Sequence, residues 1–186
     1  MNQIKFVLNP GILRRIALKV LDYIHSNTES GIDASGKPFA PYSTNPFSMP
    51  AGAFFAKTTA RQRAKLNANG DLEFFRAKSG KRWVVIDGGY LNWKRSKNPS
   101  FRNVVDLVDT GQMMRSLSVI AVDQDSATIG FTNKEAAEKA YYHNVAGAGK
   151  RKAIRKFLGI TNDQEKMIVK MAADNITVDF GSLVKT

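Results

Sequence analysis

The sequence predicts α-helices together with strands that pair as hairpins, which are the elements of an α+β fold. Three observations lead to this prediction: an alternating apolar segment near the start, a helical apolar stripe after it, and two hairpin signals further along the chain. A chain of 186 residues is long enough for one domain with its own core, and 43% hydrophobic and 24% charged residues are an ordinary globular balance. We therefore expect a single domain over residues 1–186.

The chain is predicted to begin with a strand and a long helix. Ile4, Phe6 and Leu8 alternate with their neighbours, as in a short strand. Asn9 followed by Pro10 is a typical helix start, because Asn caps free backbone amides and Pro suits the first turn. One helical face of about 15 residues is then apolar: Ile12, Leu13, Ile16, Ala17, Val20, Leu21 and Ile24. We expect this face to pack on a core; a basic helix on a membrane surface is the less favoured alternative.

Residues 26–60 show neither a helical nor a strand period. Four prolines and three glycines interrupt most of this stretch, and a segment of this length without regular structure is usually functional or mobile. Its aromatic residues argue against a plain linker and should pack on this core or on a neighbouring subunit. They are candidate subunit contacts, ordered only in an assembled state: Phe39, Tyr42, Phe47, Phe54 and Phe55.

Residues 57–102 concentrate the positive charge. Twelve Lys and Arg against three Asp and Glu give this segment a net charge of +9, out of +12 for the whole chain. Within it, the pattern predicts a strand at 83–86, a turn at 87–89 and a returning strand at 90–93. The sequence thus indicates a basic hairpin or arm, and a solvated basic face that keeps the protein soluble accounts for the same residues equally well.

A short helix and a second hairpin are predicted next. The helix covers 109–116, with Asp109 or Thr110 as its cap. The strands of the hairpin lie at 116–121 and 128–131, with a polar turn between them.

Two capping boxes and a strand complete the chain. Thr132 with Glu135 and Thr161 with Gln164 have the spacing at which side chain and backbone cap each other, so each predicts the start of a helix. Residues 176–180 alternate and predict a closing strand.

The sequence contains no complete metal or phosphate-loop pattern. Without cysteine, disulfides and thiolate sites are excluded, and a zinc site would have to be built from two histidines and carboxylates. A phosphate loop at 148–150 fails, because Asn144 and Arg151 stand where Gly and Ser or Thr are needed. We expect neither a metal nor a cofactor.

The sequence also contains no set of residues that is typical of an active site. His143 is the best acid–base candidate, but no nucleophile motif accompanies it, and a structural histidine with a favourable charge at a helix C-terminus is the preferred interpretation. Asp123 and Asp125 lack the glycine and glutamate of a calcium loop and fit turn chemistry better. We expect no catalytic residue, no small-molecule substrate and no enzymatic activity.

The net charge of +12 favours a polyanionic or acidic partner. No apolar run approaches the roughly 20 residues of a membrane span, and the N-terminus lacks the layout of a signal peptide. We therefore expect the chain in the cytoplasm of its host cell or in a particle assembled there. The candidate contacts to a polyanion or a partner are Arg61, Arg63, Lys65, Lys81, Arg82, Lys94, Arg95, Lys97, Lys150, Arg151 and Lys152, the last three beginning a cluster that continues with Arg155 and Lys156.

Four segments in order resemble one protein family. They are 31–43 (GIDASGKPFAPYS), 105–117 (VDLVDTGQMMRSL), 129–131 with 140–144 (IGF and AYYHN), and 155–161 (RKFLGIT). Together they resemble the phage virion morphogenesis proteins, the tail-completion proteins of Mu-like phages. The family usually has proline where this chain has Lys156, and residues 43–104 form a longer and more basic insertion than the family predicts.

The resemblance implies a structural protein with an α+β fold. In this fold an antiparallel sheet is flanked by helices, with a long N-terminal helix and residues 43–104 as an inserted basic loop or hairpin arm. Such proteins act at the head–tail junction or the head-proximal end of the tail, as rings that end tail-tube growth or seal the neck. The implied partners are copies of the same chain and other neck or tail proteins, with packaged DNA or an acidic neighbour meeting the basic segment. A non-enzymatic nucleic-acid-binding protein of another family, using this basic segment, is the alternative.

Overall fold

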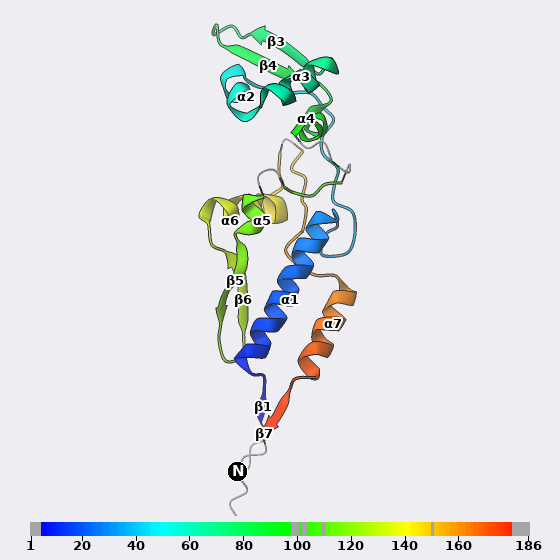
Figure 1. Ribbon diagram of the computed structural model, residues 1–186, viewed down its shortest axis with the longest axis vertical. Helices are drawn as coiled ribbons and strands as arrows, with labels where there is room; N and C mark the ends of the chain where they lie inside the picture. Colours follow the sequence, from blue (N-terminus) through cyan, green and yellow to red (C-terminus); the bar gives the residue numbers. More distant parts are fainter. Residues whose placement is uncertain (1–4, 98–100, 102–103, 109–110, 150, 180–186) are drawn as a thin grey trace, which may run out of the picture. The chain divides into compact units, whose positions relative to one another are not determined.

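The computed structural model describes residues 5–97, 101, 104–108, 111–149 and 151–179. The chain divides into two compact units, unit 1 (Met1–Ala40 and Val105–Thr186) and unit 2 (Pro41–Val104). Both units combine helices with small antiparallel sheets (Figure 1), so the predicted α+β class is confirmed. The basic insertion predicted over 43–104 lies within unit 2.

Unit 1 is built around one long helix, which packs against a two-stranded hairpin and against a C-terminal helix (Figure 1). A second two-stranded sheet joins the two ends of its described chain. Its elements are β1 (Lys5–Val7), α1 (Pro10–Glu29), α5 (Gln112–Arg115), β5 (Leu117–Val122), β6 (Ala127–Phe131), α6 (Lys134–Tyr141), the π-helical turn η1 (Tyr142–Ala146), α7 (Asn162–Ala173) and β7 (Thr177–Asp179).

Helix α1 begins where the sequence predicts and runs further. The Asn9 side chain accepts a hydrogen bond at 2.7 Å from the amide two residues later, with Pro10 in the first turn. The helix has 20 residues because its last turn continues through Asn27 and Thr28, which are buried although polar. The Thr28 hydroxyl donates to the Ile24 carbonyl at 2.7 Å, which satisfies it within the helix. Polar residues therefore end the apolar stripe in the sequence without ending the helix.

The second predicted hairpin forms as β5 and β6, paired antiparallel with one register shift. Helix α6 follows it, and the Asn133 side chain caps this helix by accepting from the Ala136 amide at 3.1 Å. The capping box predicted for Thr132 and Glu135 is wrong, because the Thr132 hydroxyl instead donates to the Ser116 carbonyl at 3.2 Å.

The other predicted capping box is confirmed. The Thr161 hydroxyl accepts from the Gln164 amide at 3.4 Å, and the Gln164 side chain accepts from the Thr161 amide at 2.9 Å. Helix α5 follows Gly111, whose φ of 74° favours glycine. The caps predicted for that helix, Asp109 and Thr110, lie outside the described residues.

The first and last predicted strands pair with each other. β1 and β7 are antiparallel, with Lys5 opposite Asp179 and Val7 opposite Thr177. The ends of the described chain are thereby held side by side.

Unit 2 packs three helices on a three-stranded antiparallel sheet of order β2–β4–β3. Its elements are β2 (Phe47–Pro50), α2 (Ala51–Lys57), α3 (Ala60–Ala68), β3 (Leu72–Arg76), β4 (Arg82–Ile86) and α4 (Gly89–Lys97). Val84 and Ile86 of the central strand are fully buried. They meet Phe54 of α2, Leu66 of α3 and Trp93 of α4 in one core. One face of the sheet is thus turned toward all three helices.

Two predictions for this part of the chain are wrong. Residues 26–60, predicted to lack regular structure, contain the end of α1 as well as β2 and α2, and Pro50 sits at the end of an edge strand, where proline is tolerated. Residues 90–93, predicted as the returning strand, lie in α4, and β4 pairs with β2 and β3 instead. Gly88 and Gly89, with φ of 70° and 67°, turn the chain into that helix, and a side chain at Gly89 would collide with backbone carbonyls of the loop before β2.

Candidate functional site

Three of the four segments that carry the family resemblance are hydrogen-bonded to one another in unit 1, around the loop 31–40. Asp33 shapes this loop, because its carboxylate accepts hydrogen bonds at 2.7–2.9 Å from the Ser35 amide, the Ser35 hydroxyl and the Lys37 amide. Burial acts to raise the pKa of Asp33, but these hydrogen bonds and the Lys37 charge outweigh it, and the net effect lowers the pKa. An ionised carboxylate therefore holds the loop in its turn.

This loop is hydrogen-bonded to the last of the four segments. The Arg155 side chain is buried, and its Nε donates at 2.9 Å to the Ala40 carbonyl, 115 positions away in the chain. The Ala34 amide donates to the Lys156 carbonyl at 2.8 Å. A Cβ at Gly159 would come within 2.7 Å of the Ala34 Cβ, so the approach requires glycine. Arg155 thus belongs to the fold and not to the basic surface that the sequence predicts for it.

The turn η1 is hydrogen-bonded to the segment that begins at Arg155. The Arg155 amide donates to the His143 carbonyl at 2.6 Å, and the Leu158 amide donates to the Asn144 side chain at 3.1 Å. Burial, together with the Arg155 charge, lowers the pKa of His143, so its imidazole is neutral at pH 7. The interpretation of His143 as a favourably charged helix end is therefore wrong. Its buried Nδ1 has no hydrogen-bond partner among the described residues, so nothing there orients it for acid–base work.

Large apolar side chains are exposed at and beside η1. They are 38–56% exposed and come from α6, from η1 and from the segment bonded to η1: Tyr141, Tyr142, Val145, Ile154 and Leu158. We call these five residues the junction patch. Exposed apolar surface among polar neighbours marks interaction sites. Sequence reasoning missed the patch, although a pair of tyrosines and two aliphatic residues beside a basic cluster were a visible signal.

The aromatic residues predicted to contact a neighbouring subunit are mostly internal. Phe54 is fully buried in the core of unit 2, and Phe39 and Tyr42 are buried as well. Phe47 is half-buried and packs against the unit 2 core. Phe39, Tyr42 and Phe54 are therefore covered by the chain itself, which corrects their assignment to a subunit contact. Of this set only Phe55 presents a ring that is nearly half exposed, at 45%.

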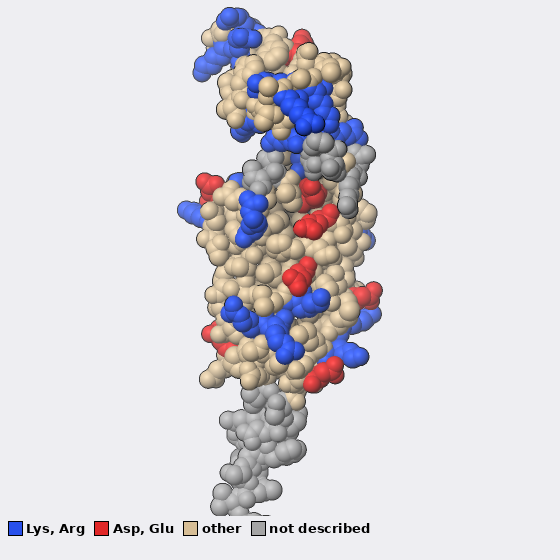
Figure 2. All heavy atoms as spheres, viewed as in Figure 1, with Lys and Arg blue, Asp and Glu red and all other residues tan. Residues whose placement is uncertain are grey.

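The structure buries some of the predicted polyanion contacts and leaves others exposed. Lys94 is buried, with its ammonium 5.6 Å from the centre of the Tyr42 ring, so its assignment as a surface contact is wrong. Lys150 lies outside the described residues. Figure 2 shows Lys and Arg gathered over the helices and the β3–β4 hairpin of unit 2. The other predicted residues are exposed or half-buried: Arg61, Arg63, Lys65, Lys81, Arg82, Arg95 and Lys97 in unit 2, and Arg151 and Lys152 in unit 1.

Two exposed rings of unit 2 stack on each other, and each has a guanidinium group beside it. The Phe55 and Phe74 rings stack with centroids 6.1 Å apart and an interplanar angle of 11°. The Arg63 guanidinium lies 5.3 Å from the centre of the Phe55 ring, and that of Arg82 lies 5.8 Å from the centre of the Phe74 ring. Phe74 and its neighbour Phe75 are 42% and 40% exposed. We call Arg63, Phe55, Phe74 and Arg82 the aromatic–arginine face; Phe75, the next residue of β3, points to the opposite face of the sheet. Sequence reasoning missed both β3 rings, although they form an aromatic pair inside the most basic segment.

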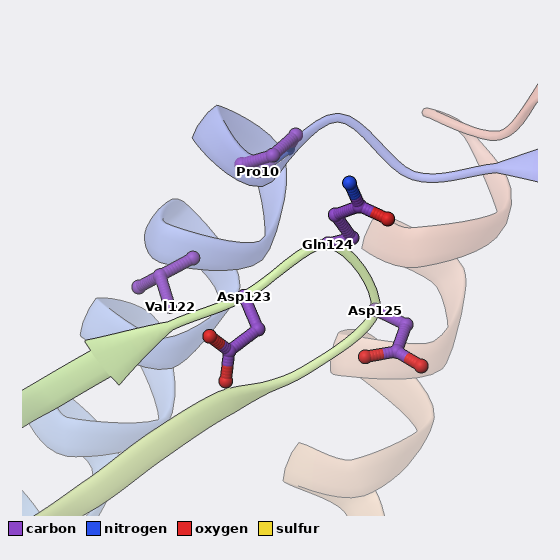
Figure 3. Close-up of a pocket in the computed structure, with 5 residues that line it drawn as sticks. All are labelled: Pro10, Val122, Asp123, Gln124 and Asp125. Atoms are coloured by element: carbon purple, nitrogen blue, oxygen red, sulfur yellow. The ribbon is translucent and has the colours of Figure 1, made fainter.

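An open hollow lies between the β5–β6 turn and the start of α1 (Figure 3). It is lined by Pro10, Val122, Asp123, Gln124 and Asp125. The Asp123 amide donates to the Ser126 carbonyl at 2.8 Å, as the predicted turn requires. No group of three or more His, Asp or Glu suited to a metal ion occurs in the part of the chain that the structure describes. The hollow is thus explained by the geometry of a hairpin turn.

No family model, curated protein or solved structure matches this chain. Within the described ranges, no helix combines the length and the apolar composition needed to cross a membrane. The features that bear on function are therefore the junction patch of unit 1 and the aromatic–arginine face of unit 2.

Proposed function

We propose that this chain is a structural subunit of a phage virion, at the head–tail junction or the head-proximal end of the tail, where identical copies close into a ring. Support comes from the four resembling segments, three of which are bonded to one another in unit 1 across long sequence distances. The observation that carries the proposal is the junction patch, whose five large apolar side chains remain 38–56% exposed on that same structure.

A ring requires two different surfaces of one subunit to recognise each other. The junction patch is an apolar surface, and burying such area is worth about 25 cal/mol per Å². The β5–β6 hairpin is a second surface, because each strand pairs only with the other in the described sheets and so presents an outer edge. Apolar burial and edge pairing would let copies add to one another without any reaction.

The partners in this role are copies of the chain and other neck or tail proteins. Unit 2 carries most of the net positive charge, which favours packaged DNA or an acidic neighbouring protein.

Light scattering coupled to size-exclusion chromatography, followed by negative-stain microscopy, tests ring formation. We expect the wild-type chain to form rings, and Val145→Glu, which puts a charge into the junction patch, to give monomers with unchanged far-UV circular dichroism. Lys134→Glu puts the same side chain at an exposed polar position of α6 and should leave the rings intact.

Two results would contradict the proposal. One is a wild-type chain that stays monomeric at every concentration. The other is a phage deleted for the chain that still joins heads to tails, as seen by electron microscopy.

A further inference from the structure

We propose that the β3–β4 hairpin of unit 2, together with the aromatic–arginine face beside it, binds single-stranded nucleic acid. This site is separate from the junction patch and does not depend on the ring proposed above. Its parts are exposed rings on an edge strand and a basic hairpin end.

Exposed rings occur on both faces of β3, an edge strand of the unit 2 sheet. Successive side chains of a strand point to opposite faces. Phe74 therefore shares a face with its cross-strand partner Val84, and Phe75 shares the other face with its partner Trp83. The three helices of the unit cover the face of Val84, whereas Phe75 is 40% exposed and Trp83 is half-buried. The Phe75 ring, which is 40% exposed on the face away from the helices, is therefore available to stack on a planar group.

All charged residues at the end of the hairpin are basic. It carries four cations: Arg76, Lys78, Lys81 and Arg82. No Asp or Glu occurs between residues 74 and 86. Arg76 and Arg82 stand directly opposite each other in the strand register, a like-charge pair that destabilises a hairpin and that a bound phosphate would neutralise. Figure 2 shows this hairpin end as a projecting cluster of Lys and Arg.

A single strand is the polyanion that uses both features. An acidic protein surface would neutralise the cations but would not need exposed rings, and a duplex keeps its base faces stacked inside the helix. A single strand offers phosphates along its backbone and unstacked bases beside them, and proteins hold such strands by aromatic stacking in a basic setting. The pairs Arg63–Phe55 and Arg82–Phe74 place guanidinium groups directly beside the stacking rings.

Fluorescence anisotropy with a fluorescein-labelled oligothymidylate tests the proposal on the full chain. We expect this probe to bind more tightly than a duplex of equal length. Phe75→Leu keeps an apolar side chain but removes the ring, so it should weaken binding about tenfold with little change in the salt dependence. Phe55→Leu removes the ring stacked on Phe74 and should act in the same direction, so the outcome does not rest on one variant.

Lys78→Gln combined with Lys81→Gln should have the complementary effect. Each phosphate contact to a single strand contributes about 0.7 to the slope of log K against log salt, so the double variant should reduce the slope by about 1.4. Lys134→Gln combined with Lys170→Gln removes the same charge from exposed positions of unit 1 and should leave the slope unchanged. Tyr23→Leu removes a half-buried ring from unit 1, outside the junction patch, and should leave the affinity unchanged.

Equal affinity for the single strand and the duplex would overturn the proposal. Wild-type affinity of folded Phe75→Leu and Phe55→Leu variants would do the same. Competition by polyglutamate that is as effective as oligothymidylate per charge would assign the face to an acidic protein partner instead. None of these results bears on the ring test, which changes Val145 of unit 1.

Discussion

Unit 2 closes a core of its own, whereas unit 1 leaves much of its apolar surface uncovered. Five side chains of unit 2, from three helices and the central strand, form one cluster in which none is more than 4% exposed. In unit 1, α7 buries none of its residues, and its Met167 and Val169 are 51% and 61% exposed. Unit 2 therefore has a closed core, while α7 of unit 1 presents exposed apolar surface that is available for the subunit contacts proposed above.

Emptying the core of unit 2 should have the strongest effect on stability. Phe54→Ala removes a fully buried ring and should destabilise unit 2 by about 3–5 kcal/mol. Both tryptophans, Trp83 and Trp93, belong to unit 2, so urea unfolding followed by tryptophan fluorescence measures this unit alone. Phe55→Ala is the matched control, because it makes the same change at a ring that is 45% exposed and should cost about 1 kcal/mol. Equal losses would remove the distinction between a closed core and an exposed face.

The contact between Arg155 and the loop 31–40 of unit 1 should have the next largest effect on stability. Arg155→Ala removes the charged donor that the Ala40 carbonyl has in the fold, for an expected loss of about 2–3 kcal/mol. The urea transition followed by far-UV circular dichroism should shift, while the tryptophan transition of unit 2 keeps its midpoint. Lys156→Ala changes an exposed neighbour and should move neither transition. A matching shift of the tryptophan signal would mean that the two units unfold together.

The two units also share one local motif in different surroundings. Thr59 with Gln62 caps α3, and Thr161 with Gln164 caps α7, through the same pair of reciprocal hydrogen bonds. Gln164 additionally exchanges two hydrogen bonds, at 2.8 and 2.9 Å, with the buried Asn27 amide of α1. Gln164→Ala should therefore cost about 1–2 kcal/mol, because the Asn27 amide loses that partner, whereas Gln62→Ala should cost less than about 1 kcal/mol. Similar losses of unfolding free energy for the two variants would show that the pair between α1 and α7 adds nothing.

Helix and strand starts could be predicted from the sequence where one local interaction decides them. Asn9 and Thr161 cap their helices as predicted, because a cap uses backbone groups only two or three residues away. Thr132 does not cap α6, because the side chain of the neighbouring Asn133 caps it instead. The Thr132 hydroxyl donates to the Ser116 carbonyl, 16 residues earlier in the chain. A local sequence pattern does not show a competing partner that is distant in the chain.

Burial, and with it most of the candidate sites, could not be predicted in the same way. Phe54 lies in a stretch that looks irregular, yet it is the centre of a core because its partners come from three later segments. Lys94 has the composition of a surface residue, but α4 buries it beside the Tyr42 ring. Phe74 and Phe75 have the composition of core residues, but they lie on an edge strand and stay exposed.

The effect of pH should be the weakest and should be confined to unit 1. Both histidines, His25 and His143, belong to that unit. Burial and the Arg155 charge lower the pKa of His143 in the folded chain below its ordinary value of 6.5. Below that value the unfolded chain binds the proton more readily than the folded one. This contribution to stability is therefore complete above pH 6.5, declines as the pH falls below it, and is lost once the pH passes the lowered folded pKa.

Urea unfolding between about pH 7.5 and 5.5 measures this dependence. We expect the far-UV circular-dichroism transition, to which the helices of both units contribute, to move to lower urea as the pH falls, and the tryptophan transition of unit 2, which has no histidine, to move less. His143→Gln removes the titrating ring and should flatten the dependence in unit 1, because glutamine binds no proton in this range. If the variant keeps the wild-type slope, the pH sensitivity of unit 1 comes from another group, and the half-buried imidazole of His143 contributes nothing to it.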